Sequence, residues 1–263
     1  MDYSSRLLQT KKVIAHIVNW LKSYVENSGT KGFVVGISGG IDSAVTSTLC
    51  AKTGLPVIAL NMPIYQNQSE ISRSNEHIAW LQENFTNVTY SCVNLTDSFK
   101  SIEATFPEDI QDFLTMANTR ARLRMTTLFA FAGHHKMIVA GTGNKVEDFG
   151  VGFFTKYGDG GVDISPIADL MKTEVYTLAK EMNIANSILT AAPTDGLFDD
   201  GRSDEDQMGA TYPELEWAMT FKGDETTLNS RKKEVLTIFR KLNTANQHKM
   251  IAIPVCTIPD NLK

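Results

Sequence analysis

The sequence has few cysteines and no long apolar run. Its three cysteines, Cys50, Cys92 and Cys256, are far apart and odd in number, which argues against both a disulfide framework and a zinc site. Cys50 and Cys92 lie in apolar segments, so we expect both to be small buried residues. No apolar stretch approaches the length of a membrane span, and the first twelve residues lack the apolar core of a signal peptide. We therefore expect a cytoplasmic protein with no membrane partner.

Clustered positive charge and the common nucleotide-binding motifs are also missing. The net charge is −5, and the longest basic run is the three residues 231–233. Proteins that bind nucleic acid gather Lys and Arg on one surface, so we expect no nucleic-acid partner. The main glycine-rich stretch has neither the Gly-Lys-Ser/Thr ending of a Walker A loop nor a GxGxxG pattern. With 263 residues and no evident linker, we expect a single domain spanning residues 1–263.

The best-defined motif lies at residues 32–48, which read GFVVGISGGIDSAVTST. A short apolar run leads through a serine-glycine turn into apolar residues at helical spacing, which predicts a buried strand, a tight turn and a helix N-terminus. Such a turn directs backbone N–H groups and the positive helix end at one place, where an anion binds. Asp42 would repel a phosphate unless a cation lay between them, so we interpret it as a Mg²⁺ ligand. The alternative is an ordinary turn capped by serine or aspartate.

Apolar runs and helical patterns alternate along the first 140 residues. Strands are expected at 33–35, 57–60, 88–93 and 137–140, and helices at 4–27, after Ser69 and at 109–132. The long helix has an apolar stripe formed by Leu114, Ala117, Ala121, Met125, Leu128 and Ala132. Further helices are expected at about 169–182, 212–222 and 224–242. The alternation predicts an α/β fold, a Rossmann-like doubly wound parallel sheet with C-terminal helices, which binds ligands beyond the carboxyl ends of its strands.

Two long segments carry no clear periodicity. Residues 143–166 contain six glycines and follow a strand that ends near Gly141. In this segment Glu147 could share one Mg²⁺ with Asp42, although a solvated surface glutamate is the alternative. Residues 193–211 contain six acidic residues, and we expect them to form a mobile lid that keeps water from the reaction. Plain disorder is the alternative for that segment.

Residues 38–43 read SGGIDS and resemble the SGGxDS loop of the PP-loop ATP pyrophosphatases, which cleave ATP to AMP and pyrophosphate. Further motifs follow in order: NxxARxRM at 118–125, GT…E at 141–147, GFFTKYGDGG at 152–161, PTDGL at 193–197, SDE at 203–205 and HK at 248–249. Together they resemble the NAD⁺ synthetases over about residues 30–250. The resemblance implies the adenine nucleotide alpha-hydrolase-like form of the three-layer α/β fold.

The resemblance implies a ligase that amidates deamido-NAD⁺ (nicotinic acid adenine dinucleotide) with ammonia. The nicotinate carboxylate would attack the α-phosphorus of the co-substrate ATP and expel pyrophosphate, and ammonia would then displace AMP from the acyl-adenylate. Residues implied to contact ATP are Gly36, Ile37, Ser38, Gly39, Gly40, Ile41, Asp42, Ser43, Thr142, Lys172 and Thr194. Those implied to contact deamido-NAD⁺ are Arg122, Lys156, Asp163, His248 and Lys249, and the implied Mg²⁺ ligands are Asp42 and Glu147.

Two residues have open interpretations, and one motif departs from the family pattern. Asp159 is expected to accept a proton from ammonium or from the attacking amine, although a turn-capping aspartate is the alternative. Arg122 alternates with two other arginines on the long helix, so we expect it to point inward, with a solvated helix face as the alternative.

Many ammonia-dependent relatives read GTDHAAE where this chain has GTGNKVE, and one extra residue lies between Glu147 and Phe153.

The resemblance also implies a homodimer in which the dinucleotide lies across the subunit boundary. About thirty residues precede the ATP loop, and the cysteines lack a nucleophile context, so free ammonia rather than glutamine is the expected nitrogen source. Two other functions stay open: another amidating or thiolating PP-loop enzyme, and a non-catalytic ATP-binding sensor. A tRNA-modifying enzyme should show a basic surface or a cysteine pair, and a sensor would more naturally lack Asp42, Glu147 or the lysines.

Overall fold

A four-stranded parallel sheet lies at the centre of the computed structural model, which describes residues 8–66, 68–191 and 203–263. The strands are β1 (Phe33–Gly36), β2 (Val57–Asn61), β3 (Val88–Cys92) and β4 (Ile138–Val139), in the order β3-β2-β1-β4. The α-helices are α1 (Thr10–Ser28), α2 (Ile41–Lys52), α3 (Gln68–Asn84), α4 (Thr96–Thr105), α5 (Phe113–His135), α6 (Lys172–Glu181), α7 (Asn186–Leu189), α8 (Asp204–Met208), α9 (Tyr212–Thr220) and α10 (Ser230–Met250). Shorter elements are the 3₁₀ turns η1 (Glu108–Ile110), η3 (Glu225–Thr227) and η4 (Asp260–Leu262) and the π-helix η2 (Val146–Val151).

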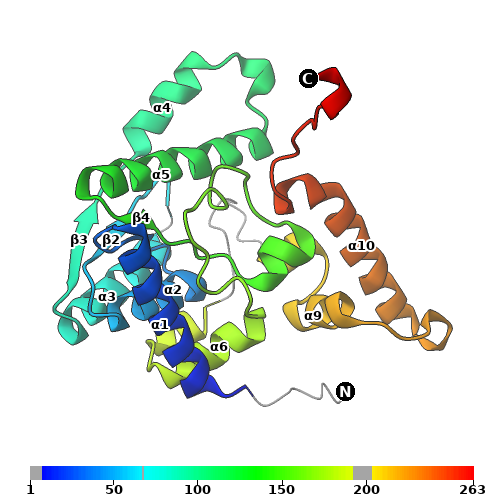
Figure 1. Ribbon diagram of the computed structural model, residues 1–263, viewed down its shortest axis with the longest axis horizontal. Coiled ribbons are helices and arrows are strands. Elements are labelled where there is room, and N and C mark those ends of the chain that lie inside the picture. Colours follow the sequence, from blue (N-terminus) through cyan, green and yellow to red (C-terminus); the bar gives the residue numbers. More distant parts are fainter. Residues whose placement is uncertain (1–7, 67, 192–202) are drawn as a thin grey trace.

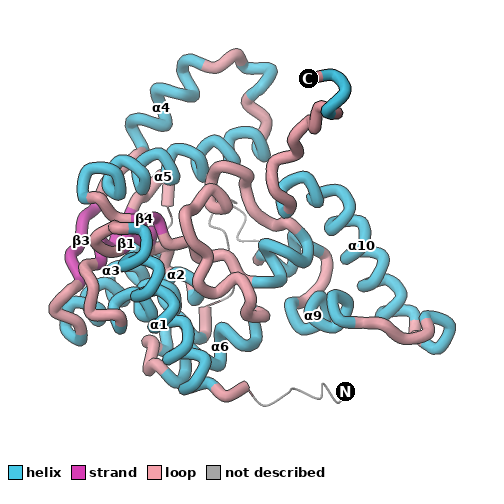
Figure 2. Tube along the Cα trace, viewed as in Figure 1, coloured by secondary structure: helices cyan, strands magenta, loops and turns pink. Residues whose placement is uncertain are grey.

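Alternate residues of the central strands enter two separate apolar clusters. Val34 and Ile58 pack with side chains of α4 and α5, whereas Phe33, Val35 and Val57 pack with those of α1, α2, α3 and α6. Side chains alternate across a strand, so a strand that is apolar throughout needs helices on both faces. Figure 1 shows these helices around the sheet, and Figure 2 shows how little of the chain is strand. The predicted doubly wound α/β fold is confirmed.

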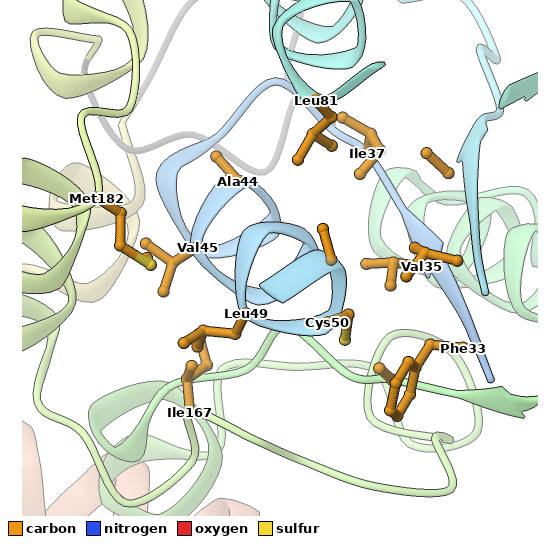
Figure 3. Packing of buried hydrophobic residues seen from close by; sticks show 14 of the residues in the cluster. Phe33, Val35, Ile37, Ala44, Val45, Leu49, Cys50, Leu81, Ile167 and Met182 are labelled. Atoms are coloured by element: carbon orange, nitrogen blue, oxygen red, sulfur yellow. The ribbon is translucent and has the colours of Figure 1, made fainter. Parts of the chain in front are cut away.

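Helix α2 lies in the larger cluster. Figure 3 shows Val45 beside Met182 and Leu49 beside Ile167. Leu49 is fully buried, and burying such a side chain stabilises the fold by about 1.5–3 kcal/mol. Cys50 is buried here as predicted. The helix that carries the serine-glycine turn is therefore anchored over much of its length.

A third apolar cluster lies beyond the sheet and joins η2, α9 and α10. Val146 and Val151 of η2 pack with Leu215 of α9 and with Val235 and Leu236 of α10. These five side chains are at most 3% exposed. The segment 143–166, for which the sequence shows no periodicity, therefore contains a helical turn that is held by two distant helices.

Several predicted elements differ in detail. β3 is an edge strand with one neighbour, so Tyr90 and Cys92 are exposed and the prediction of a buried Cys92 is wrong. Leu114 is 65% exposed rather than part of the buried stripe, because the first turn of α5 extends over the cavity described below. The last long helix begins at Ser230 rather than 224, where the side chain of Asn229 accepts from Lys232 N–H.

The described part of the predicted lid is helical and packed. Ser203 and Asp206 form a reciprocal capping box at the start of α8, which stabilises a helix N-terminus. Met208 and Ala210 are buried in the third cluster. Residues 193–202 of the predicted lid lie outside the described residues. None of the helices in residues 8–66, 68–191 and 203–263 is both long and apolar enough to cross a membrane.

Candidate active site

The turn between β1 and α2 is shaped by its own hydrogen bonds. The hydroxyls of Ser38 and Ser43 lie 3.1 Å apart, and Gly40 N–H donates to Ser38 Oγ at 3.2 Å. Gly39 has a φ of +86°, and a Cβ there would lie 2.7 Å from the carbonyl oxygen of Glu70, so only glycine fits. No described side chain caps the N-terminus of α2. The structure therefore disfavours the capped-turn alternative, and the first N–H groups of α2 stay available to an anion.

This turn forms one wall of a cavity of about 660 Å³, within the range of small-molecule sites. The cavity lies at the carboxyl ends of β1 and β4, as predicted. The predicted site residues that line it are Gly36, Ile37, Ser38, Gly39, Gly40, Ile41, Asp42, Ser43, Thr142, Glu147, Asp159, Lys172, His248 and Lys249. Arg122, Lys156 and Asp163 are not among the described residues that line it. Thr194 lies outside the described residues.

Lys172 lies between the two carboxylates that the sequence assigns to a metal. Its Nζ is 2.5 Å from Asp42 Oδ2 and 3.0 Å from Glu147 Oε1, and its side chain is only 3% exposed. Burial alone would lower the pKa of this ammonium group, but the two carboxylates more than offset that effect and hold the pKa above its ordinary value. The lysine therefore stays charged, and the two carboxylates converge on one cationic position.

The same position fits a divalent cation. Asp42 and Glu147 belong to separate segments and supply oxygen donors around one point, and Mg²⁺ commonly takes one or two carboxylates together with phosphate oxygens. Across the described ranges, no cluster of three or more His, Cys, Asp or Glu side chains is arranged to hold a metal ion. A metal ion at this point would therefore take its remaining ligands from water or from a bound phosphate.

Asn144 sets the two carboxylates relative to each other. This buried side chain accepts from the N–H groups of Val146 and Glu147 at 3.1 and 3.2 Å through Oδ1. Its Nδ2 donates to Asp42 Oδ1 at 3.3 Å. The residues that follow form the π-helix η2, an element found frequently at functional sites. Sequence reasoning missed Asn144, although an asparagine just after a strand and before a helical turn is a recognisable capping signal.

Asp148 occupies the space that a side chain at Gly143 would need. A Cβ on Gly143 would lie 2.1 Å from Asp148 Oδ1. The carboxyl group that lies next to Gly143 is therefore supplied from five residues later in the chain. Burial, with smaller contributions from Glu147 and Asp159, raises the pKa of Asp148 to about 8. Sequence reasoning missed this residue as well.

Asp159 lines the cavity, and its side chain is exposed to the space inside it. It accepts from Thr155 N–H at 3.0 Å, and burial raises the pKa of its carboxyl group. A second cavity of about 130 Å³ adjoins the first, and Asp148, Asp159 and Lys249 line both. The hydrogen bond to Thr155 N–H is that of a turn-capping aspartate. The position of Asp159 between the two cavities also suits a proton acceptor, so both interpretations of this residue remain open.

Four residues predicted to bind the dinucleotide form a chain of contacts between α5 and α10. Arg122 Nε donates to the carbonyl oxygen of Lys156 at 3.3 Å, and Lys156 Nζ donates to that of His248 at 2.7 Å. Lys249 Nζ donates to the carbonyl oxygen of Phe154 at 2.7 Å, and burial lowers the pKa of Lys249. Of these four, His248 and Lys249 line the cavity. The other two, Arg122 and Lys156, lie behind the cavity wall.

The prediction of an inward-pointing Arg122 is wrong. Arg120 is the buried arginine, with its guanidinium 5.8 Å from the ring of Phe99. Arg124 lines the cavity and donates to Gln66 Oε1 at 2.7 Å. Arg122 does point away from the other two, but it is exposed. A sheet covers only one side of α5, and the alternation alone does not say which side that is.

Asp163 also has a backbone partner. Its Oδ2 accepts from Val139 N–H at 2.7 Å and so supports β4. The adjacent bridge between Ala140 and Ile164 continues the parallel pairing. Within the described chain this carboxylate therefore stabilises the sheet edge.

Tyr212 and Asp204 join the site from the C-terminal helices. Asp204 belongs to the SDE motif at residues 203–205, whereas no sequence pattern marks Tyr212. The buried hydroxyl of Tyr212 donates to Glu147 Oε1 at 2.5 Å and lies 3.4 Å from Asp204 Oδ2. Burial and the neighbouring Glu147 raise the pKa of Tyr212, so the hydroxyl keeps its proton. Asp204 lines the cavity. The carboxylate of Glu147 is thus held by a helix that lies 65 residues further along the chain.

The chain is similar to known proteins over most of its length. Residues 13–252 match the family model described as NAD synthase. The NH(3)-dependent NAD(+) synthetase of Mycoplasma genitalium is 42% identical over 233 residues, which cover 88% of this chain and 90% of that protein. The enzyme of the same name from Carboxydothermus hydrogenoformans is 36% identical, with 89% and 92% covered.

Solved structures are similar as well. The NMN synthetase from Francisella tularensis has a TM-score of 0.84 and 33% identity, with 96% of this chain and 99% of that chain covered. The NH3-dependent NAD synthetase from Campylobacter jejuni has a TM-score of 0.76 and 25% identity, with 95% and 100% covered. The fold, the SGGIDS turn and these matches over most of the chain agree: the chain belongs to the NAD synthase family.

Proposed function

We propose that this protein amidates deamido-NAD⁺ with ammonia to give NAD⁺, consuming ATP and releasing AMP and pyrophosphate. The observation that carries the proposal is the convergence of Asp42, Glu147 and Lys172 on one cationic position beside the SGGIDS turn. A polyphosphate needs N–H donors and cations, and both face the same cavity. The names of the similar proteins support the choice of reaction.

The first step joins two anions, so the protein must position them and neutralise charge. The turn at residues 36–43 would hold the β- and γ-phosphates, and Asp42 and Glu147 would hold Mg²⁺ against them. Bound Mg²⁺ would supply positive charge at the phosphates. Lys172 now occupies the point between the carboxylates, so it would move onto the phosphates when a metal ion takes its place. Attack by a nicotinate oxygen then forms an O–P bond to the α-phosphorus and breaks the bond to pyrophosphate.

The second step adds ammonia to the activated carbonyl carbon. The nitrogen forms the new C–N bond and loses a proton, and AMP leaves with one oxygen of the original carboxylate. Asp159 lies at the junction of the two cavities, where its carboxylate would accept that proton. Water must be kept from the acyl-adenylate during this step, and residues 193–211 would supply the cover.

We also propose that the protein acts as a homodimer. Arg122 and Lys156 lie behind the cavity wall near the surface, where a ligand held across two subunits would meet them. Phe113 and Leu114 of α5, which also line the cavity, are 45% and 65% exposed, and a second subunit that covered them would close this side of the cavity. Light scattering at micromolar concentration should report twice the chain mass. A fully active monomer would remove this part of the proposal.

The main experiment uses deamido-NAD⁺ labelled with ¹⁸O in its nicotinate carboxylate. Incubation with ATP, Mg²⁺ and ammonium should give NAD⁺, AMP and pyrophosphate in equal amounts, and the AMP should carry one ¹⁸O. Label in pyrophosphate or phosphate instead would contradict the acyl-adenylate route. Glutamine in place of ammonium should give no NAD⁺. Release of ADP and phosphate would contradict the proposed reaction class.

A second acceptor is favoured by one comparison. The similar structure with the TM-score of 0.84 is an NMN synthetase, whose name implies amidation of nicotinate mononucleotide, the dinucleotide without its AMP half. Arg122 and Lys156, which are expected to contact the dinucleotide, are also not among the described residues that line the cavity. Measuring kcat/KM for both acceptors with the same enzyme decides between them. A preference of tenfold or more, about 1.4 kcal/mol, assigns the substrate.

A further inference from the structure

Tyr212 contacts two residues of the proposed metal and phosphate site but has no part in the reaction described above. Its hydroxyl donates to Glu147 Oε1 at 2.5 Å, and the Nζ of Lys172 lies 4.7 Å from the centre of its ring. The side chain is 3% exposed. One residue therefore contacts the proposed metal ligand through its oxygen and the proposed phosphate-binding lysine through its ring.

The two carboxylates have matching sets of donors. Asp42 receives Lys172 on Oδ2 and the amide of Asn144 on Oδ1. Glu147 receives both Lys172 and Tyr212 on Oε1. Each carboxylate is thus bound by the shared ammonium group and by one neutral donor of its own.

The two neutral donors become important when Mg²⁺ replaces the ammonium group of Lys172. Mg²⁺ binds oxygen at about 2.0–2.1 Å, so it cannot share the point between the carboxylates with an ammonium group. Once Lys172 leaves, its hydrogen bonds to both carboxylates are lost. Asn144 then still holds Asp42, and Tyr212 still holds Glu147. Without the tyrosine hydroxyl, Glu147 would keep no side-chain donor from the residues that the structure describes.

The backbone around Tyr212 ties this contact to the C-terminal helices. Tyr212 begins α9, and its N–H donates to Glu205 Oε1 of α8 at 2.8 Å. The next turn of α9 places Leu215 in the third apolar cluster, where it is fully buried. The hydroxyl therefore projects from a rigid support rather than from a loop, as a group that orients a metal ligand requires.

We propose that Tyr212 is a positioning residue for the metal site: its hydroxyl orients Glu147 for Mg²⁺ after Lys172 has moved to the phosphates. The inference rests on the proposed function through the metal role of Glu147. A purely structural role, in which the tyrosine only anchors α9, predicts loss of stability without a change in metal affinity.

The test is Tyr212→Phe, which keeps the ring and removes one oxygen. Mn²⁺ is titrated by electron paramagnetic resonance in the presence of an ATP analogue with a methylene group between the α- and β-phosphorus atoms. We expect Mn²⁺ affinity to fall about 10- to 100-fold, as for other groups that orient metal ligands. The kcat should fall while KM for deamido-NAD⁺ stays unchanged. The matched control is Tyr65→Phe, which removes a 2.7 Å hydrogen bond to Glu103 outside the cavity and should leave Mn²⁺ affinity unchanged.

A double variant adds a second measurement. If Tyr212 acts through Glu147, then Glu147→Gln with Tyr212→Phe should bind Mn²⁺ no more weakly than Glu147→Gln alone. Wild-type Mn²⁺ affinity in Tyr212→Phe, or additive losses in the double variant, would overturn the inference. Absence of NAD⁺ formation by the wild type would instead refute the proposed function, because Mn²⁺ affinity is measured without turnover.

Discussion

The two walls of the cavity are built in different ways. The wall formed by residues 36–43 is local: its hydrogen bonds join Ser38, Gly40 and Ser43, and its helix is anchored behind it. The opposite wall is assembled over long sequence distances, because Tyr212 of α9 holds Glu147 of η2. The first wall presents backbone N–H groups, and the second presents side chains. A local sequence pattern can therefore predict the wall formed by residues 36–43, whereas the wall that contains Glu147 depends on tertiary packing.

The largest loss of activity is expected when one carboxylate is removed from either wall, in two separate variants. Asp42→Asn and Glu147→Gln should each lower pyrophosphate release by about 1,000-fold, because a transition state rich in negative charge loses its cation. Circular dichroism should show an unchanged fold. Turnover near that of the wild type in Glu147→Gln would mean that the long-range wall does not bind the metal.

The local wall can be broken at one glycine. In Gly39→Ala the new Cβ would lie 2.7 Å from the carbonyl oxygen of Glu70 at a positive φ, and the turn must shift. Displacing the phosphate-binding groups by about 1 Å should lower pyrophosphate release by about 100-fold. Gly54→Ala is the matched control, since its φ of +76° is similar but no atom lies within 4 Å of the new Cβ. It should lose about 1 kcal/mol of stability and keep its activity. Equal losses in both variants would show that strain alone explains the effect.

The long-range wall should show a pH dependence through Asp148. Its pKa of about 8 in the folded protein lies above the value of about 3.9 expected when unfolded. Between these values the folded state binds the extra proton, so stability falls as pH rises through this window and levels off above pH 8. Asp148→Asn removes the effect, and its Tm advantage over the wild type should grow by roughly 5 °C from pH 5 to pH 8. Thermal denaturation in metal-free buffer measures it, and a constant difference across this range would contradict the assignment.

The smallest effect on activity is expected for Arg122, which lies behind the cavity wall. Arg122 is exposed and donates one 3.3 Å hydrogen bond to a backbone oxygen, so Arg122→Ala should change the free energy of unfolding by less than about 0.5 kcal/mol. The KM for deamido-NAD⁺ should rise severalfold if the arginine contacts that substrate, with no change in the KM for ATP. Steady-state kinetics with each substrate varied in turn will separate the two. An unchanged KM for both would leave Arg122 a solvated helix residue.

The sequence predicts the sheet, the turn and the general position of the site, because each rests on short-range patterns. Val34 and Val35 must face opposite sides of a strand, and the SGGIDS residues shape their own turn. It does not predict that Arg120 rather than Arg122 is buried, since that depends on where α4 crosses α5. It also does not mark Tyr212 or Asp148. Their roles follow from which helices pack around η2, and that packing has no local signature.

The contact between Gly143 and Asp148 couples two positions that lie five residues apart. An aspartate introduced at 143 alone would collide with the carboxyl group of Asp148, and removal of Asp148 alone would leave that space without a carboxyl group. Residues in direct contact have effects that do not add, so we expect the effect of changing both positions to differ from the sum of the two single effects. Any redesign of this part of the site therefore has to treat residues 143–148 as one unit.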